Sequence, residues 1–286
     1  MVEMRYIVPP AWYKGVYQDA KSPVNAGRSF SLVHEKKSSR AVLCIHGYAG
    51  YPGEMVRPAV DLYEKGFDVF VPRLPGMGTT GEDFMRSRRS DWLMVCVNAT
   101  EDLKKKYEEV YLVGHSMGSA LAILTAAKTG IKRIVTACPA IAYDGWKPAK
   151  PFPVMLVFSF VKKRIPQPWH HQSEYVLHYE NAPCDDDYLG GQYWSWVYIR
   201  EVYELMKLMD EARNVLPSLN ADILTISGGK DQIVGDKSSL EIMEKGRGNN
   251  KHIHLPECTH FVYYDIDKGG EEKAVEATVD WLTALS

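Results

Sequence analysis

Residues 110–128 read VYLVGHSMGSALAILTAAK and contain the clearest structural pattern in the chain. An unbroken apolar run leads into GHSMG at 114–118, which fits the pattern G-x-S-x-G, and a good helix sequence follows it. A serine held in a strained turn between a strand and a helix needs glycines on both sides, because larger side chains would collide across the turn. The stretch therefore predicts that Ser116 is a nucleophile at the carboxyl edge of a sheet, beside the positive end of the next helix.

The same alternation of apolar run and helix extends outward from this stretch. Short apolar runs predict strands at 41–45, 67–71, 110–113, 134–137, 223–226 and 252–255. Segments that suit helices lie between them, at 54–65, 91–107, 117–129, 237–245 and 271–285. Most of the strand runs are almost wholly apolar, as in parallel strands that are covered on both faces. We therefore predict an α/β fold with a mostly parallel central sheet flanked by helices.

Residues 139–214 interrupt the alternation. They contain no convincing strand but many Trp, Tyr and Pro residues. We interpret them as a mostly helical cap, inserted between two parts of one core domain, 1–138 and 215–286. Such a cap would lie over the carboxyl ends of the strands, where open α/β sheets bind their ligands.

Composition excludes several other classes of protein. The chain has 286 residues, with 34 Lys plus Arg against 36 Asp plus Glu, and so lacks the basic character of a nucleic-acid-binding protein. The longest apolar run, at 151–161, is too short to span a membrane, so we expect no stable membrane insertion. The amino terminus has no signal-peptide pattern, and the five cysteines show no paired or metal-finger spacing. These features favour a cytoplasmic protein with reduced thiols and no metal site.

A serine hydroxyl needs a base to take its proton. In this fold the catalytic residues follow one another along the chain in the order serine, acid, histidine. Among the later histidines, His260 follows the last strand directly and precedes the last helix, which places it at the same sheet edge as Ser116. His252 and His254 alternate within a strand, and three others fall in the insertion, at 170, 171 and 178. We therefore assign His260 as the base.

The acid that orients the histidine should also lie at this edge. Asp231 follows the run ILTISGGK, whose two glycines allow a tight loop after the strand. Asp222 precedes that strand, Asp236 better suits the cap of the next helix, and Glu257 is too close to His260 in sequence. Asp231 is therefore the predicted partner of the His260 ring.

An oxyanion hole requires two rigid donors aimed at the developing charge. The sequence HGYAG at 46–50 follows the first predicted strand, and Gly47 allows its backbone to approach closely. We predict that the backbone N–H groups of Tyr48 and Met117 form the hole, and that His46 is structural.

These segments together resemble the α/β-hydrolase family, in particular the bacterial carboxylesterases and monoacylglycerol lipases. The resemblance covers most of 42–282 and rests on HGYAG at 46–50, VPRLPGMGTTGEDF at 71–84, GHSMGSAL at 114–121, SGGKDQIV at 227–234 and CTHF at 258–261. It implies the triad of Ser116, Asp231 and His260, the same two oxyanion donors, and a cap domain. Two departures are Ser119, where many relatives have glycine, and the Trp- and Tyr-rich cap.

The expected function is a serine hydrolase that cleaves small carboxylic esters, with short- to medium-chain acyl groups or monoacylglycerols, through an acyl-enzyme on Ser116. Tyr48, Trp146 and Trp194 are candidates for contact with the substrate, since an apolar pocket suits an acyl chain. The mechanism needs no cofactor, and the sequence carries no dinucleotide or nucleotide-phosphate motif. A thioesterase, amidase or peptidase would use the same triad, and a non-catalytic binding protein could use the same scaffold. The oligomeric state stays open.

Overall fold

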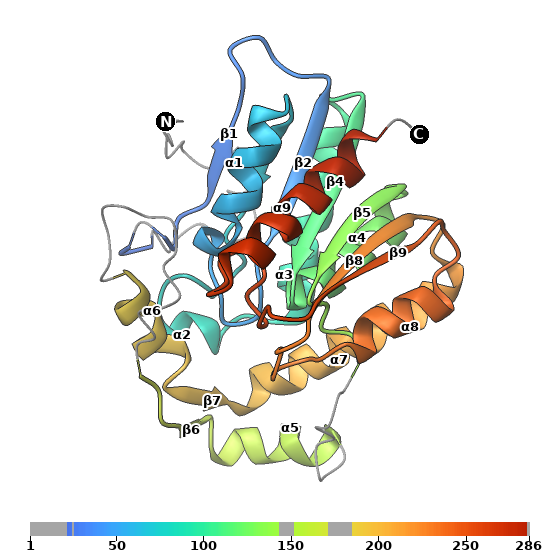
Figure 1. Ribbon diagram of the computed structural model, residues 1–286. Helices are drawn as coiled ribbons and strands as arrows, with labels where there is room; N and C mark the ends of the chain where they lie inside the picture. Colours follow the sequence, from blue (N-terminus) through green and yellow to red (C-terminus); the bar gives the residue numbers. More distant parts are fainter. Residues whose placement is uncertain (1–21, 25, 143–151, 171–184, 285–286) are drawn as a thin grey trace.

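The computed structural model describes residues 22–24, 26–142, 152–170 and 185–284. Within these residues, a seven-stranded sheet in the order β1-β3-β2-β4-β5-β8-β9 forms the centre of the molecule (Figure 1). Its strands are β1 (Phe30–Leu32), β2 (Arg40–Ile45), β3 (Asp68–Val71), β4 (Glu109–His115), β5 (Arg133–Ala137), β8 (Asp222–Gly228) and β9 (Lys251–Leu255). All neighbouring strands pair in parallel except β1, which is antiparallel to β3. The predicted mostly parallel α/β sheet is confirmed.

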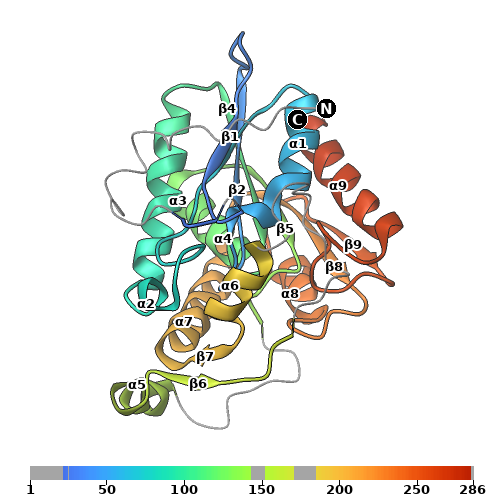
Figure 2. The same cartoon turned by 90° about the vertical axis from the view of Figure 1, so that its left-hand side faces the viewer.

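Helices cover both faces of the sheet, as its apolar strands require. Figure 2 shows α1 (Val56–Glu64) and α9 (Lys268–Thr283) on one side and α3 (Arg89–Lys104) on the other. α4 (Met117–Thr129) packs beside α3 and is buried along almost its whole length, and α8 (Lys237–Lys245) connects β8 to β9. Shorter helical turns lie at Pro52–Met55, Gly81–Phe84 (α2) and Leu216–Ser218.

The strands end in register where the predicted catalytic loops begin. Ile45 of β2 pairs with Gly114 of β4, and Ala137 of β5 pairs with both His115 and Ile226. On the far side, Gly228 of β8 pairs with Leu255 of β9. The loops that follow β2, β4, β5, β8 and β9 therefore leave the sheet at one common edge.

The segment between β5 and β8 lies beyond this edge (Figure 1). Its described elements are α5 (Phe152–Val161), β6 (Arg164–Pro166), α6 (Asp185–Tyr193), β7 (Trp196–Tyr198) and α7 (Ile199–Val215). α7 packs against α4 and α3 of the core, and α5 packs on the outer side of α7. That this segment acts as a cap stays a prediction. Among the described residues, no helix has both the length and the apolar character that crossing a membrane requires.

The expectation of no strand in this segment is wrong, because β6 and β7 form a small antiparallel sheet. Each has three residues, and about thirty residues of chain separate them, so neither carries a periodic pattern of useful length. The boundary predicted at 139 stays a prediction. Residues 140–142 are hydrogen-bonded to the core, since the N–H of Ala140 donates to Ser116 and those of Ile141 and Ala142 donate to Ser238.

Candidate active site

Ser116 occupies a strained turn between β4 and α4. Its φ of 53° and ψ of −120° lie outside the regions that a residue with a side chain favours. The surrounding backbone holds the turn in place, since the Ser116 N–H donates to Ala137 and its carbonyl accepts from Ser119 and Ala140. The side chain therefore starts from the carboxyl edge of the sheet, at the first turn of a buried helix.

The two glycines of GHSMG are required by close backbone contacts. A Cβ added at Gly114 would lie 2.3 Å from the carbonyl oxygen of Gly118. One added at Gly118 would lie 2.0 Å from the carbonyl oxygen of Ile45 on the neighbouring strand. The first contact crosses the turn as the sequence predicts, and the second ties the start of α4 to the end of β2.

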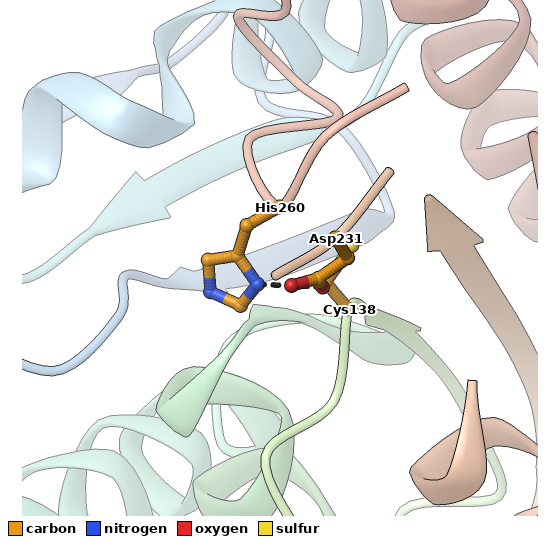
Figure 3. Close-up of side chains that lie close together, drawn as sticks. All are labelled: Cys138, Asp231 and His260. Carbon is orange, nitrogen blue, oxygen red and sulfur yellow. Dashed lines mark hydrogen bonds and ion pairs between the residues drawn. The ribbon is translucent and has the colours of Figure 1, made fainter. Parts of the chain in front are cut away.

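Asp231 and His260 meet at the same edge. Figure 3 shows the imidazole facing the carboxylate, with 2.8 Å between Nδ1 of His260 and Oδ2 of Asp231. Both side chains are buried, with exposed fractions of 6% and 1%. A carboxylate only accepts hydrogen bonds, so Nδ1 carries the proton of the neutral ring and Nε2 keeps a free lone pair. This tautomer is the one that a general base for serine requires.

The surroundings shift the pKa values of both groups in the direction that this role requires. Burial lowers the pKa of His260 below its ordinary value of 6.5, and this effect outweighs the opposing effect of Asp231. Burial alone would raise the pKa of Asp231. The hydrogen bond and charge of His260, together with the N–H groups of Val234 and Ile233, instead lower it to about 2. The carboxylate is therefore charged and the imidazole neutral near neutral pH.

Backbone contacts fix the acid loop against the histidine loop. The N–H of Gly229 donates to Leu255, and that of Lys230 donates to Cys258. A Cβ added at Gly228 would lie 2.1 Å from the carbonyl oxygen of Thr259. The glycine at the end of β8 thus permits this close approach of two loops.

The histidine loop has an acidic support of its own. Asp265 is fully buried, and its carboxylate accepts from the N–H and the hydroxyl of Thr259 at 2.7 Å each and from the N–H of Asp267 at 3.0 Å. These bonds fix the backbone directly before His260. The rival acid Asp236 does precede α8, but its side chain makes no capping hydrogen bond and instead lies 3.5 Å from His254.

The loop after β2 lies directly beside Ser116. A Cβ added at Gly47 would be 3.3 Å from the Cβ of Ser116. Tyr48 follows Gly47, and Met117 follows Ser116 as the first residue of α4, so the backbones that carry the two predicted oxyanion donors are close neighbours. His46 is buried and structural, because its Nε2 accepts from the N–H of Leu74 and its Nδ1 contacts the Gly47 carbonyl.

A buried carboxylate lies beneath this loop. Oε2 of Glu54 accepts from the N–H of Gly47 at 3.1 Å and lies 3.6 Å from Nδ1 of His115. On its other side, Nε2 of His115 contacts the backbone carbonyl of His260 at 2.9 Å. Burial raises the pKa of Glu54, but His115, His46 and the Gly47 N–H together lower it below its ordinary value. A charged Glu54 thus contacts the predicted oxyanion loop directly, and through His115 it is linked to the backbone of the predicted base, His260.

Cys138 is the third side chain in Figure 3. It follows β5 with a positive φ of 43°, and its sulfur lies within 4.8 Å of the ligand atoms of Asp231 and His260. Thiolate, carboxylate and imidazole are zinc ligands, but burial holds the pKa of this thiol well above its ordinary value. The four described cysteines are all free and buried, as expected of reduced thiols.

The predicted substrate contacts differ in their placement. The Tyr48 ring packs edge-on against Phe84 and Trp92, and its hydroxyl is buried without a hydrogen-bond partner among the described residues. Trp194 is partly buried, between Tyr51 of the core and Trp169 of the cap segment. Trp146 lies outside the described residues. A role of these three in substrate binding stays a prediction.

The sequence reasoning missed Glu54, His115 and Asp265. His115 is the second residue of the nucleophile motif, and the motif does not indicate which group that side chain faces. The sequence pattern places Glu54 in a helix, and it gives Asp265 no role. One signal could have indicated the two carboxylates: Glu54 and Asp265 each follow, within a few residues, a loop that carries predicted catalytic groups.

The family model described as Hydrolase_4, serine aminopeptidase S33, matches residues 36–267. The chain belongs to this family. The match includes the loop after β2, the nucleophile turn, the whole cap segment and the acid and histidine loops. The resemblance to the α/β-hydrolases inferred from the motifs is thereby confirmed.

Three similar proteins give the family match more detail. A thermostable monoacylglycerol lipase of Bacillus sp. (strain H-257) is 37% identical over 86 residues, 30% of this chain and 34% of the relative. A carboxylesterase of Bacillus subtilis (strain 168) is 28% identical over 104 residues, 36% and 42% of the two chains. These matches span between a third and a half of the two relatives. The crystal structure of a monoacylglycerol lipase of Paleococcus ferrophilus superposes with a TM-score of 0.69 at 17% identity, over 89% and 97% of the two chains, and shows the shared fold.

Proposed function

We propose that this chain is a serine hydrolase that cleaves carboxylic esters through an acyl-enzyme on Ser116. The observation that carries the proposal is the buried hydrogen bond of 2.8 Å between Asp231 and His260, at the sheet edge where Ser116 starts its strained turn. The names of the two Bacillus relatives, a lipase and an esterase, support an ester as the substrate.

In the first half of the reaction, Nε2 of His260 takes the hydroxyl proton while Oγ of Ser116 bonds to the carbonyl carbon. The electron pair of the carbonyl moves onto its oxygen, where the N–H groups of Tyr48 and Met117 stabilise it. When the pair returns, the bond to the alcohol breaks and the alcohol leaves with the proton from His260. Asp231 stabilises the imidazolium between these two steps.

In the second half, water repeats the sequence in place of the serine hydroxyl. His260 takes a proton from water, the resulting oxygen attacks the acyl carbon, and the acid is released as Ser116 regains its proton. The proposed substrates are esters with short- to medium-chain acyl groups or monoacylglycerols. The aromatic rings of Tyr48 and Trp194 are the described candidates for contact with them.

The test is hydrolysis of p-nitrophenyl esters from acetyl to palmitoyl and of 1-monoacylglycerols, by the wild type and by Ser116→Ala. We expect a chain-length optimum and a loss of roughly 10⁴- to 10⁶-fold in the variant. A fluorophosphonate probe should label the wild type and leave the variant unlabelled. Labelling without ester hydrolysis would overturn the ester proposal, and a folded wild type without labelling would overturn the nucleophile assignment.

The alternative substrates are thioesters, amides and peptides, since the same groups could attack any of these carbonyls. The family description names a serine aminopeptidase, so the panel should include acyl thioesters and amino-acid p-nitroanilides. The substrate with the highest kcat/KM decides between these chemistries. A binding protein without catalysis would fail to react with the probe and with every member of the panel.

A further inference from the structure

The thiol of Cys138 lies beside the hydrogen bond that joins Asp231 to His260 (Figure 3). Its sulfur, a carboxylate oxygen of Asp231 and a ring nitrogen of His260 all lie within 4.8 Å of one another. The three side chains come from the loops after β5, β8 and β9, so no spacing in the sequence reveals the group. The proposed reaction uses the carboxylate and the imidazole but gives the thiol no part. The sulfur is thus an additional electron donor at the same place.

The backbone of Cys138 is strained and held in position. Among the described residues, three besides glycine have a positive φ: Ala49, Ser116 and Cys138. The first two belong to the predicted oxyanion loop and to the nucleophile turn, and strain of this kind concentrates at functional sites. The N–H of Cys138 donates to the carbonyl of Ile226 at 2.8 Å, which ties the residue to β8. The thiol is therefore kept beside Asp231 by the backbone that carries it.

The spacing of the three donor atoms is close to what one zinc ion requires. Zinc binds sulfur at about 2.3 Å and nitrogen or carboxylate oxygen at about 2.1 Å, so its tetrahedral ligands lie roughly 3.4–3.6 Å apart. Shifts of about 1 Å would bring the three side chains to this spacing. Asp231 can move Oδ2 in this way, because its Oδ1 accepts the N–H groups of Ile233 and Val234 at 2.7 and 3.0 Å and keeps the loop in place.

The charge of a zinc ion would be balanced at this position. The side chains of Cys138, Asp231 and His260 are all buried, and an unbalanced charge among them would be costly. One thiolate and one carboxylate carry two negative charges, which match those of Zn²⁺, so no net charge is buried. Burial holds the pKa of the free thiol well above its ordinary value, but a coordinated metal ion deprotonates a thiol directly. Thiolate and imidazole also favour zinc over magnesium or calcium.

We propose that Cys138, Asp231 and His260 form a zinc site that inhibits the proposed reaction. Zinc binds Sγ of Cys138, Oδ2 of Asp231 and Nδ1 of His260, and water completes the tetrahedron. The thiol loses its proton to water while the ring proton moves from Nδ1 to Nε2, so one proton is released for each ion bound. The imidazole then has no free lone pair for the hydroxyl proton of Ser116, and attack on the ester stops.

The inhibition rests on the proposed function, in which His260 is the base, whereas metal binding does not. Binding is therefore measured with Ser116→Ala, and inhibition with the wild type. Metal binding in a protein that neither hydrolyses esters nor reacts with the fluorophosphonate probe would count against the proposed function alone. Ester hydrolysis without metal binding would count against the zinc site alone.

The binding test uses Co²⁺, which a thiolate ligand gives a charge-transfer absorption band in the near ultraviolet. We expect this band with Ser116→Ala, and we expect Zn²⁺ to remove it by competition, because zinc binds such ligands more tightly than cobalt. On the same background, Cys138→Ser should abolish the band and weaken zinc binding by about 100-fold or more, since the soft thiolate is lost.

The inhibition test uses hydrolysis of a p-nitrophenyl ester. Zinc should inhibit the wild type, EDTA should restore the rate, and an excess of Mg²⁺ should have no effect because magnesium prefers oxygen ligands. Zinc should also slow labelling by the fluorophosphonate probe, which needs the same base. In Cys138→Ser, half-inhibition relative to the variant's own rate should require about 100-fold more zinc.

Matched controls separate this site from other thiols. Cys96 and Cys258 are also free and buried, and Cys258 lies in the histidine loop itself. Cys96→Ser and Cys258→Ser should keep the cobalt band and the zinc sensitivity of their parents. Thermal unfolding checks that each variant is folded, and Cys138→Ala replaces Cys138→Ser if the latter is not. The proposal is overturned if the parent shows no thiolate band, if the Cys138 variant is as sensitive to zinc as the wild type, or if EDTA restores no activity.

Discussion

Oε2 of Glu54 accepts a hydrogen bond of 3.1 Å from the backbone N–H of Gly47. Both groups are buried, and a Cβ added at Gly50 would lie 2.3 Å from the other carboxylate oxygen, so the side chain fills the space beneath the loop. The loop that is proposed to stabilise the oxyanion therefore rests on a charged group that has no part in the proton transfers.

The first prediction concerns this support. Glu54→Ala should lower kcat by about 10- to 100-fold with little change in KM, because the loop N–H groups would lose their alignment with the developing charge. Glu54→Gln keeps an acceptor for Gly47 and should recover most of the rate. The measurement is steady-state hydrolysis of a p-nitrophenyl ester. Equal rates in the alanine variant and the wild type would show that the loop holds its geometry without Glu54.

The second prediction concerns pH. His260 must be neutral to accept the serine proton, so kcat/KM should fall as the pH falls through the pKa of His260. Because burial lowers that pKa, the midpoint should lie below 6.5. Asp231, with a pKa of about 2, stays charged across this range. The measurement is a pH profile of kcat/KM with a neutral ester, and a midpoint above 6.5 would contradict the expected effect of burial.

The third prediction concerns the orienting acid. Asp231→Asn should lower kcat by roughly 10⁴-fold, because an amide no longer selects the tautomer with a free Nε2. The negative charge of Asp231 raises the pKa of His260, so the residual activity should have its acid limb at lower pH than in the wild type. As a control, Asp236→Asn changes a carboxylate near His254 and should leave kcat unchanged. A larger loss in the control would move the assignment to Asp236.

The fourth prediction concerns the glycines. Gly118→Ala should give an insoluble or inactive protein, because the new methyl group would lie 2.0 Å from the backbone carbonyl oxygen of Ile45 at the end of β2. Gly191→Ala, within α6, meets no atom within 4 Å and should be tolerated or slightly stabilising. Expression, circular dichroism and thermal unfolding distinguish the two. A stable, active Gly118→Ala protein would contradict the described packing of the nucleophile turn.

The fifth prediction concerns Glu201, whose pKa rises from 4.5 to about 7 on folding. Between these values the folded protein binds the proton more readily than the unfolded chain, so stability from this group falls as the pH rises and is lowest above 7. Glu201→Gln should therefore raise Tm above pH 7 by roughly 2 to 6 °C and change it little below pH 4.5. Glu257→Gln, an exposed control, should change Tm little at either pH. A lower Tm of Glu201→Gln above pH 7 would show that its pair with Arg88 outweighs the cost of burial.

The sequence predicted the central sheet well because most of its strands are apolar on both faces, and six runs coincide with strands β2, β3, β4, β5, β8 and β9. It missed β1, β6 and β7, which have three residues each and exist only through partners distant in the chain. Periodicity needs several turns or alternations to be visible, and these strands offer too few.

The predicted triad residues come from loops that leave one sheet edge, and the motif together with the chain order of serine, acid and histidine predicts them. The supporting side chains were not accessible in this way. Glu54 and His115 contact the loops after β2 and β9, at the Gly47 N–H and the His260 carbonyl, and which side chain faces which loop depends on packing. The glutamate at position 54 is the same residue in the sequence whether its carboxylate is buried under a loop or solvated on a helix, so the residue type alone does not reveal its environment.

The packing of α7 on the core has a consequence for how the protein unfolds. Six of its side chains besides Glu201 are buried, and Arg89 of α3 forms ion pairs of 2.6 and 2.9 Å with Glu204 and Glu211. The inserted segment thus ends in a helix that completes the hydrophobic layer over α4. Core and insertion should therefore unfold in one cooperative thermal transition. Deletion of the insertion would expose the apolar surface of α4 that α7 covers, and the remaining core should aggregate.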